Sequence, residues 1–256
     1  MDRLQLDKNA KLTGRVYFKD EVMWLGLSGS GASFTFDGTK LVLKLKGDNI
    51  AVGENPIDYA RIAVYVDGKR VVDEMINCAE KEVTVIDLTE SAKSVVEIIK
   101  LSESPMSAVG IEAFAEGSAE SLPEKQLKIE FIGDSITCGY GVDDEDENHQ
   151  FTTATEDVTK AYAYKTAKAL DAEYSMFSAS GYGIVSGYTE GDEPISEQTI
   201  PQFYCSYGFS RGNFAGTAPQ DIPWDFSKYI PQIIVINLGT NDDSYCRDYK
   251  DRQAVF

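Results

Sequence analysis

The chain has 256 residues, of which 43% are hydrophobic, and a formal net charge of −18 at pH 7. This strong negative charge would repel phosphates, so it argues against a nucleic-acid partner and against anionic membrane surfaces. No apolar run approaches the roughly 20 residues that cross a bilayer, which excludes a membrane-spanning helix. A neutral substrate, such as a sugar, is compatible with the charge.

The N-terminus lacks the basic and apolar regions of a secretory signal peptide. We therefore expect a cytoplasmic protein, or a secreted one if the N-terminus has been trimmed. The four cysteines lie far apart, without a C-x-x-C pair: Cys78, Cys138, Cys205 and Cys246. Such spacing suits neither a zinc site nor a disulfide framework, so we expect buried free thiols, no metal and no cofactor.

Residues 12–115 have the period of β-strands. Apolar residues alternate with polar ones in 41–45, 62–66 and 109–113, which indicates strands with one buried face. Asp67-Gly68 separates two such runs and predicts a tight hairpin. Further turn signals are Asp37-Gly38 and Gly47-Asp48-Asn49. The pattern predicts an all-β sandwich of the jelly-roll kind over residues 1–117.

Residues 118–125 are small and polar, and they predict a linker between two domains. From 126 to 256 the period changes: strands are predicted at 127–132, 174–179 and 233–236, and helices at 160–170 and 245–256. The strand 233–236 is continuously apolar, as expected of a central parallel strand covered on both faces. Strand, helix and strand in this order predict a three-layer, flavodoxin-like α/β domain.

Three short motifs follow the predicted strands: Gly-Asp-Ser-Ile at 133–136, Ser-Gly-Tyr-Gly at 180–183 and Gly-Thr-Asn-Asp at 239–242. Because the carboxyl ends of parallel strands meet at one edge of a sheet, we expect the motifs to form one site. Each motif also has a simpler interpretation. Ser135 and Asn241 are good helix caps, and glycines are typical of turns.

The three motifs, in this order, resemble the sequence blocks of SGNH (GDSL-like) hydrolases. The runs 60–72, 99–103 and 109–111 resemble the jelly-roll domain of carbohydrate esterase family two, and 152–157 and 224–228 are similar to its second domain. The resemblance spans nearly the whole chain. It implies a serine esterase that removes O-acetyl groups from plant polysaccharides or oligosaccharides, such as xylan and mannan.

The resemblance also implies roles for individual residues. Ser135 would be the nucleophile, which forms an acetyl-enzyme. The oxyanion would be held by the backbone N–H groups of Ser135 and Gly181 and by the side-chain amide of Asn241. Gly183 would replace Gly181 if the register differs by two residues.

SGNH hydrolases take their general base from a histidine near the C-terminus. The only histidine here is His149, which lies beside the acidic stretch 143–147. Neighbouring carboxylates favour its protonated form, which is the wrong state for a base, so we expect no catalytic base in this chain. We interpret the chain as truncated at its C-terminus. An incomplete sheet predicts an aggregation-prone second half beside a sandwich that folds independently.

The acidic stretch has the alternate spacing of an EF-hand loop, but His149 and Thr155 stand where that loop needs glycine and glutamate. We expect a solvated loop instead. Aromatic residues of the second half are candidates either for stacking on sugar rings or for packing: Tyr182, Tyr188, Tyr204, Tyr207 and Trp224.

Two other functions stay open. A non-catalytic carbohydrate-binding protein would use the sandwich as its binding module. A hydrolase acting on lipid esters or thioesters would share all three motifs, and only the jelly-roll domain argues against it.

Overall fold

The structure is a computed structural model that describes residues 1–191 and 193–247. The strands are β1 (Asp2–Leu4), β2 (Lys11–Thr13), β3 (Val16–Lys19), β4 (Val22–Leu25), β5 (Gly31–Gly47), β6 (Ala60–Val66), β7 (Lys69–Ile76), β8 (Glu80–Lys100), β9 (Val109–Ser121), β10 (Lys128–Gly133), β11 (Glu173–Ser178) and β12 (Ile233–Asn237). The α-helices are α1 (Leu6–Asn9), α2 (Ser135–Cys138), α3 (Tyr162–Ala169), α4 (Ile200–Phe203) and α5 (Thr240–Cys246). The predicted helix 245–256 falls mostly outside the described residues. None of the described helices is long and apolar enough to cross a membrane.

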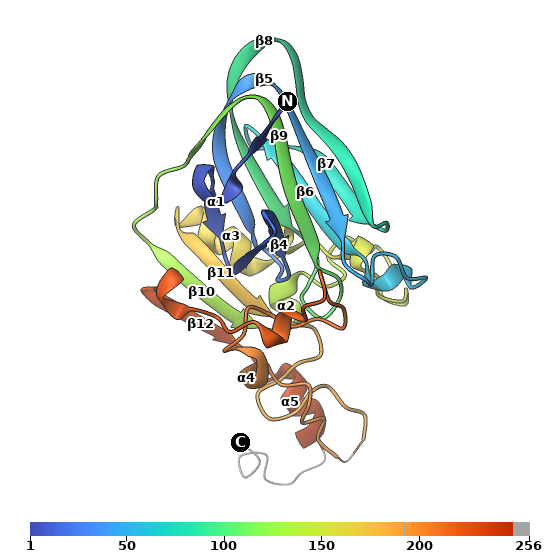
Figure 1. Cartoon of the computed structure of the whole chain (residues 1–256). Coiled ribbons are helices and arrows are strands. Elements are labelled where there is room, and N and C mark those ends of the chain that lie inside the picture. The colour runs from blue at the N-terminus through green and yellow to red at the C-terminus, as the bar shows by residue number, and fades with distance from the viewer. Residues whose placement is uncertain (192, 248–256) are drawn as a thin grey trace.

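Strands β1 to β9 form one antiparallel sheet in the order β3-β4-β9-β5-β8-β6-β7, with β1 paired to β9 and β2 to β5. The long strands β5, β8 and β9 arch together at the end of the molecule far from α5 (Figure 1). The alternation predicted in 41–45 is confirmed, because Leu41, Leu43 and Leu45 are fully buried in one core cluster. The predicted hairpin is also confirmed between β6 and β7, with φ of 50° at Asp67 and 78° at Gly68.

The predicted turn at Asp37-Gly38 is wrong, because both residues lie inside β5. The register of β5 with β8 and β9 shifts between Gly38 and Lys40, so this irregularity is a bulge. A Cβ atom on Gly38 would lie 2.3 Å from the carbonyl oxygen of Glu116. The glycine therefore allows two strands to approach closely and does not turn the chain.

The segment 118–125, predicted as a linker, is strand in its first half, since β9 continues to Ser121 and pairs there with β5. The two halves of the chain also share a core cluster. Ala63, Ile99 and Leu101 pack with apolar residues of β10, α3 and β11. This shared core favours coupled unfolding of the two halves rather than independent folding of the first.

In the second half, β10 lies between β11 and β12 in a parallel sheet. Helix α3 packs against it through Ala163 and Ala167. The helix predicted at 160–170 is longer than the observed α3. Leu170 comes after the last residue of α3, and it is 54% exposed, so it does not pack against the sheet as part of the helix. The order of strand, helix and strand is as predicted from the sequence.

The prediction that 233–236 is covered on both faces is wrong for the described part of the chain. Ile233, Ile234 and Ile236 are 44%, 54% and 63% exposed. The reason is that β12 pairs with β10 alone among the described strands, so it forms an edge of the sheet. An exposed apolar edge strand is a common site of aggregation.

A fully buried arginine in the first half of the chain contacts the long loops of the second half. Arg15, between β2 and β3, donates a hydrogen bond of 2.6 Å to the carbonyl oxygen of Tyr204. Its guanidinium lies 4.4 Å from the ring centre of Phe177 and 3.5 Å from the carboxylate of Glu130. This arginine therefore joins the antiparallel sheet to β10, β11 and the segment that follows α4.

Candidate active site

The candidate nucleophile sits on a tight turn between β10 and α2. The carboxylate of Asp134 caps α2 by accepting a hydrogen bond of 3.0 Å from the N–H of Ile136. A Cβ atom on Gly133 would lie 2.0 Å from Oγ1 of Thr137, so only glycine fits where the strand meets the helix. Ser135 is half-buried as the first residue of α2. Its position at the carboxyl end of a parallel strand agrees with the prediction.

The structure brings the three predicted site residues together. Ser135, Gly181 and Asn241 line one cavity of about 340 Å³. The other lining residues are Glu103, Met106, Tyr140, Phe151, Ser180 and Tyr188. Of these, Glu103 and Met106 come from the loop between β8 and β9, so the first half of the chain contributes to the site.

The geometry distinguishes Gly181 from Gly183. The N–H of Gly183 donates to the carbonyl oxygen of Gln198 at 3.2 Å, so it is already used. Gly181 lines the cavity and has a φ of 80°, a conformation that favours glycine. The structure records no hydrogen bond from the N–H of Gly181, or from that of Ser135, to another described residue. Both donors therefore remain available.

Asn241 is held at the start of α5. Its side-chain amide donates one hydrogen bond of 2.8 Å to the carbonyl oxygen of Tyr182, which leaves a second N–H on the same nitrogen. The neighbouring Asp242 accepts hydrogen bonds from the N–H groups of Ile184, Val185 and Ser186. The loop after Gly183 is thus ordered by a carboxylate for which sequence reasoning predicted no role.

His149 does not line this cavity. Its side chain is 64% exposed, and Nδ1 lies 2.8 Å from a carboxylate oxygen of Asp144. It borders a neighbouring hollow in the acidic loop, which shares Tyr140 and Phe151 with the cavity. There Asp146 and Asn148 make local turns with their neighbours. Among the described residues, the lining of the Ser135 cavity contains no histidine.

The predicted aromatic candidates divide into one that lines the cavity and four that pack elsewhere. Tyr188 lines the cavity and is exposed. Tyr207 is buried and donates to the carbonyl oxygen of Trp24, while Tyr204 donates to Glu130. The remaining two pack against side chains: Tyr182 against Phe203 and Phe209, and Trp224 against Arg15.

An aromatic pair that the sequence analysis did not predict also borders the cavity. Tyr140 and Phe151 stack with ring centres 4.1 Å apart and an interplanar angle of 10°. Both residues line the cavity, and Tyr140 is exposed. Together with Tyr188 they give the site flat apolar surfaces.

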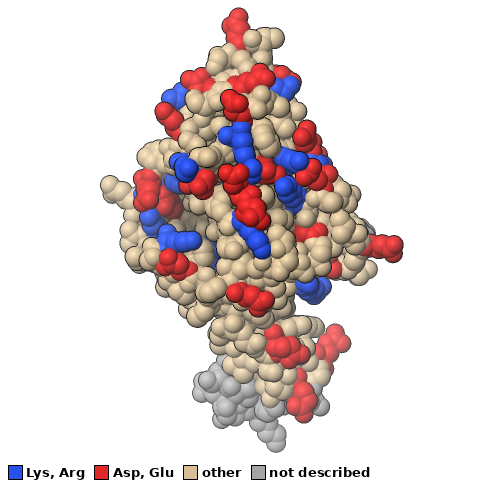
Figure 2. Space-filling view, viewed as in Figure 1, with Lys and Arg blue, Asp and Glu red and all other residues tan. Residues whose placement is uncertain are grey.

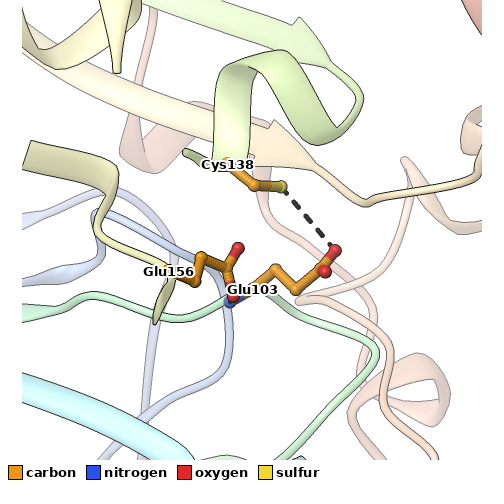
Figure 3. A group of neighbouring side chains, drawn as sticks. All are labelled: Glu103, Cys138 and Glu156. Atoms are coloured by element: carbon orange, nitrogen blue, oxygen red, sulfur yellow. Dashed lines mark hydrogen bonds between the residues drawn. The ribbon is translucent and has the colours of Figure 1, made fainter. Parts of the chain in front are cut away.

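Three buried side chains lie together beside the cavity. Glu103, Cys138 and Glu156 are fully buried, and one carboxylate oxygen of each glutamate and the Sγ atom of the cysteine lie within 4.8 Å of one another (Figure 3). Burial raises the pKa of all three groups. Lys100, also fully buried, has a pKa lowered to about 8 by the same cause. The prediction of free thiols holds for Cys78, Cys138 and Cys205, but Cys138 alone of these three is buried.

The raised pKa of Glu156 predicts a pH-dependent stability. Above 4.5, the ordinary pKa of a glutamate, the unfolded chain releases this proton while the folded chain retains it, so the unfolding free energy falls as pH rises. Glu156→Gln keeps an oxygen acceptor but carries no ionisable proton. We expect the unfolding free energy of this variant to fall less steeply with pH than that of the wild type, with slopes that differ by up to about 1.4 kcal/mol per pH unit. Urea titrations of both proteins at pH 5 and pH 8 measure the slopes. Equal slopes for the two proteins would contradict this assignment.

The surface charges are unevenly distributed. Figure 2 shows acidic and basic side chains interspersed over the antiparallel sheet, whereas on this face acidic side chains alone mark the part that carries α4 and α5. Such a surface would repel an anionic ligand and is compatible with a neutral one.

Comparisons with known proteins connect this site to a family. A family model described as carbohydrate esterase 2 N-terminal matches residues 12–125. The chain is 33% identical over 221 residues to cellulase/esterase CelE of Acetivibrio thermocellus, an alignment that covers 85% of this chain and 24% of that protein. It is 29% identical over 245 residues to an acetylxylan esterase / glucomannan deacetylase of Cellvibrio japonicus, an alignment that covers 93% of this chain and 62% of that protein.

A solved structure agrees with these matches. A family two carbohydrate esterase from Clostridium thermocellum, in complex with cellohexaose, has a TM-score of 0.75 and 28% identity over 92% of this chain and 67% of that chain. The two curated relatives are longer than this chain, which spans 24% of the length of the first and 62% of the length of the second. The similarity extends over both halves of the chain. The chain belongs to carbohydrate esterase family 2.

Proposed function

We propose that this chain belongs to a serine esterase that removes O-acetyl groups from xylan- or mannan-type polysaccharides or oligosaccharides through an acetyl-enzyme. The observation that carries the proposal is the convergence of Ser135, Gly181 and Asn241 on one cavity. Relatives named acetylxylan esterase / glucomannan deacetylase support this class of substrate. The exposed aromatic rings around the cavity support a neutral sugar as the ligand.

The chemistry follows from the donors around Ser135. Its Oγ attacks the acetyl carbonyl carbon while its proton passes to a base, and the carbonyl oxygen becomes an oxyanion. Collapse of this intermediate breaks the bond to the sugar oxygen, which leaves with a proton and releases the deacetylated sugar. Water then attacks the acetyl-enzyme and releases acetate.

Three donors are suited to stabilise the oxyanion: the N–H of Ser135, the N–H of Gly181 and the second side-chain N–H of Asn241. Fixed donors are effective because no solvent reorganisation is needed when the charge develops. Asn241 is 7% exposed and already anchored to the carbonyl oxygen of Tyr182, so its amide is held in place before substrate binds.

The same proposal extends to the architecture. We assign the antiparallel sheet, predicted over residues 1–117 and extended by β9 to Ser121, to a jelly-roll sandwich. We assign residues 126–256 to an SGNH-hydrolase domain. The switch from antiparallel to parallel pairing between β9 and β10 supports this division.

The test is release of acetate from acetylated xylo-oligosaccharides by the full chain, with and without added imidazole. Imidazole supplies the base that the described cavity lining lacks, so we expect it to accelerate release. An oxygen nucleophile deprived of its partner can still retain roughly 10³–10⁴ over the rate in water through oxyanion stabilisation and binding. Oligosaccharide binding without acetate release under either condition would instead favour the non-catalytic carbohydrate-binding function.

Replacing Asn241 by alanine tests the oxyanion assignment. Loss of one preorganised donor is expected to lower kcat by about 10²–10³ while KM changes little. Steady-state kinetics with an acetyl ester measure both parameters. Asn241→Asp, which keeps the shape but replaces the donor by an acceptor, should be equally damaging. If it retains full activity, Asn241 is not an oxyanion donor.

A further inference from the structure

We propose that Glu103 is a positioning residue of the active site: its carboxyl group holds the peptide before Gly181 in place, so that the Gly181 N–H is presented to the oxyanion. This inference rests on the proposed function, since it concerns a donor that the proposed reaction uses. It assigns to the first half of the chain a direct part in organising the site.

The contact that carries the inference crosses between the two halves of the chain. Oε2 of Glu103 accepts a hydrogen bond of 2.5 Å from the N–H of Ser180, the residue before Gly181. Glu103 is fully buried and lines the same cavity as Ser135. The N–H of Ser180 is therefore fixed by Glu103, while that of Gly181 has no recorded acceptor among the described residues.

Glu103 is itself held from several sides. Its backbone N–H donates to Oε2 of Glu156 at 3.0 Å, and its carbonyl oxygen accepts from Nζ of Lys100 at 3.0 Å. The thiol of Cys138 lies 3.8 Å from Oε2 of Glu103, the contact drawn in Figure 3. Since Cys138 belongs to α2, the helix that begins with Ser135, one carboxyl group links the nucleophile's helix to the loop of Gly181.

The charges of this cluster suit a fixed hydrogen-bond acceptor. Lys100 donates to the backbone carbonyl oxygen of Glu103, and Arg61 donates to that of Glu156. Neither bond reaches a carboxyl group, so burial favours one charged carboxylate and one protonated carboxyl group over two charges. Glu103 accepts the N–H of Ser180, and a charged acceptor makes that bond roughly twice as strong as a neutral one. A protonated Glu156 would still accept the N–H of Glu103 through its carbonyl oxygen.

A bound cation is the competing interpretation of the same cluster. Oε1 of Glu103 and Oε1 of Glu156 are buried without a described hydrogen-bond partner, and a thiol lies close by. Two carboxylates and a thiolate would suit Zn²⁺. The buried ammonium group of Lys100, hydrogen-bonded to the backbone carbonyl oxygen of Glu103, argues against a further positive charge in the cluster.

Two substitutions in the full chain test the proposal. Glu103→Ala removes the acceptor, and we expect kcat for an acetyl ester to fall about 10- to 100-fold with KM unchanged, because a donor is misplaced rather than removed. Amide hydrogen exchange at Ser180, followed by NMR, should accelerate in the same variant. Glu103→Gln keeps an oxygen acceptor and should restore most of both properties.

Glu112→Ala is the matched control. Glu112 is also an acid of the first half of the chain with little exposure, but it lies in β9, pairs with Arg3 and Lys46 and does not line the cavity. We expect it to lower stability while leaving kcat and exchange at Ser180 unchanged. If Glu103→Ala does not fold, the comparison is made with Glu103→Asp, whose shorter side chain withdraws the carboxylate from Ser180.

The outcomes separate this inference from the proposed function. Unchanged exchange at Ser180 in a folded Glu103→Ala or Glu103→Asp protein would overturn the role of Glu103, whether or not the wild-type chain turns over esters. Accelerated exchange without any Ser135-dependent turnover in the wild type would support the contact but contradict the esterase. Loss of Ser180 protection when the wild type is treated with a chelator would show a bound cation and overturn the proposal.

Discussion

Ser135→Ala is expected to abolish the imidazole-dependent turnover of acetyl esters, a fall of about 10³-fold or more, because the hydroxyl that forms the covalent intermediate is lost. Ser135 lies at the start of α2, where its backbone N–H is also open to the cavity. The alanine variant keeps that N–H, so ligand binding should survive. Initial rates with 4-nitrophenyl acetate, with the uncatalysed imidazole reaction subtracted, measure the effect.

The cavity offers a matched control for this substitution. Ser180 also lines the cavity, and its backbone N–H, which Glu103 holds, is kept in an alanine variant. Ser180→Ala removes a hydroxyl of the same type from the same cavity but should retain most of the turnover. Equal losses in both variants, or full turnover in Ser135→Ala, would show that Ser135 is not the nucleophile.

Arg15→Ala is expected to lower the unfolding free energy by about 3–5 kcal/mol, because it leaves the buried carboxylate of Glu130 without its cation. It would also leave the carbonyl oxygens of Tyr204 and Ser206 without their donor. Arg15→Lys keeps the charge but loses the planar fork, so we expect an intermediate loss. Urea unfolding followed by fluorescence at low protein concentration measures these differences.

Arg3→Ala provides the comparison for Arg15. Arg3 is partly exposed and pairs with the exposed Glu21 and with Glu112, which keeps Lys46 as a second cation. Its removal should therefore lower the unfolding free energy by clearly less than the removal of Arg15. If Arg15→Ala and Arg3→Ala destabilise the protein equally, the buried guanidinium does not fasten the two halves together.

Local patterns were enough to predict much of the fold. The alternation in 41–45 and the Asp67-Gly68 hairpin depend on residues that are close in sequence, and both are confirmed. The turn predicted at Asp37-Gly38 failed because the same dipeptide also fits a bulge, and the choice depends on the distant strands β8 and β9. Similarly, the apolar run 233–236 predicts a strand, but its covering depends on what packs against it.

The candidate site shows the same division. The motifs placed Ser135, Gly181 and Asn241 at strand ends, and parallel pairing of β10 with its two neighbours brings those ends together. Arg15 and Glu103 lie far from the motifs in sequence, and no local spacing marks them. Their roles depend on contacts between the two halves of the chain, which a pattern of neighbouring residues does not contain.

Intact-protein mass spectrometry of the chain after brief exposure to 4-nitrophenyl acetate tests the esterase mechanism most directly. Because 4-nitrophenolate is a much better leaving group than a serine alkoxide, acetylation should be faster than hydrolysis of the intermediate, so an acetyl-enzyme about 42 Da heavier should accumulate. We predict that the adduct lies on the peptide containing Ser135 and is absent from Ser135→Ala. An adduct of equal yield in Ser135→Ala, or none in the wild type even with imidazole, would contradict the mechanism.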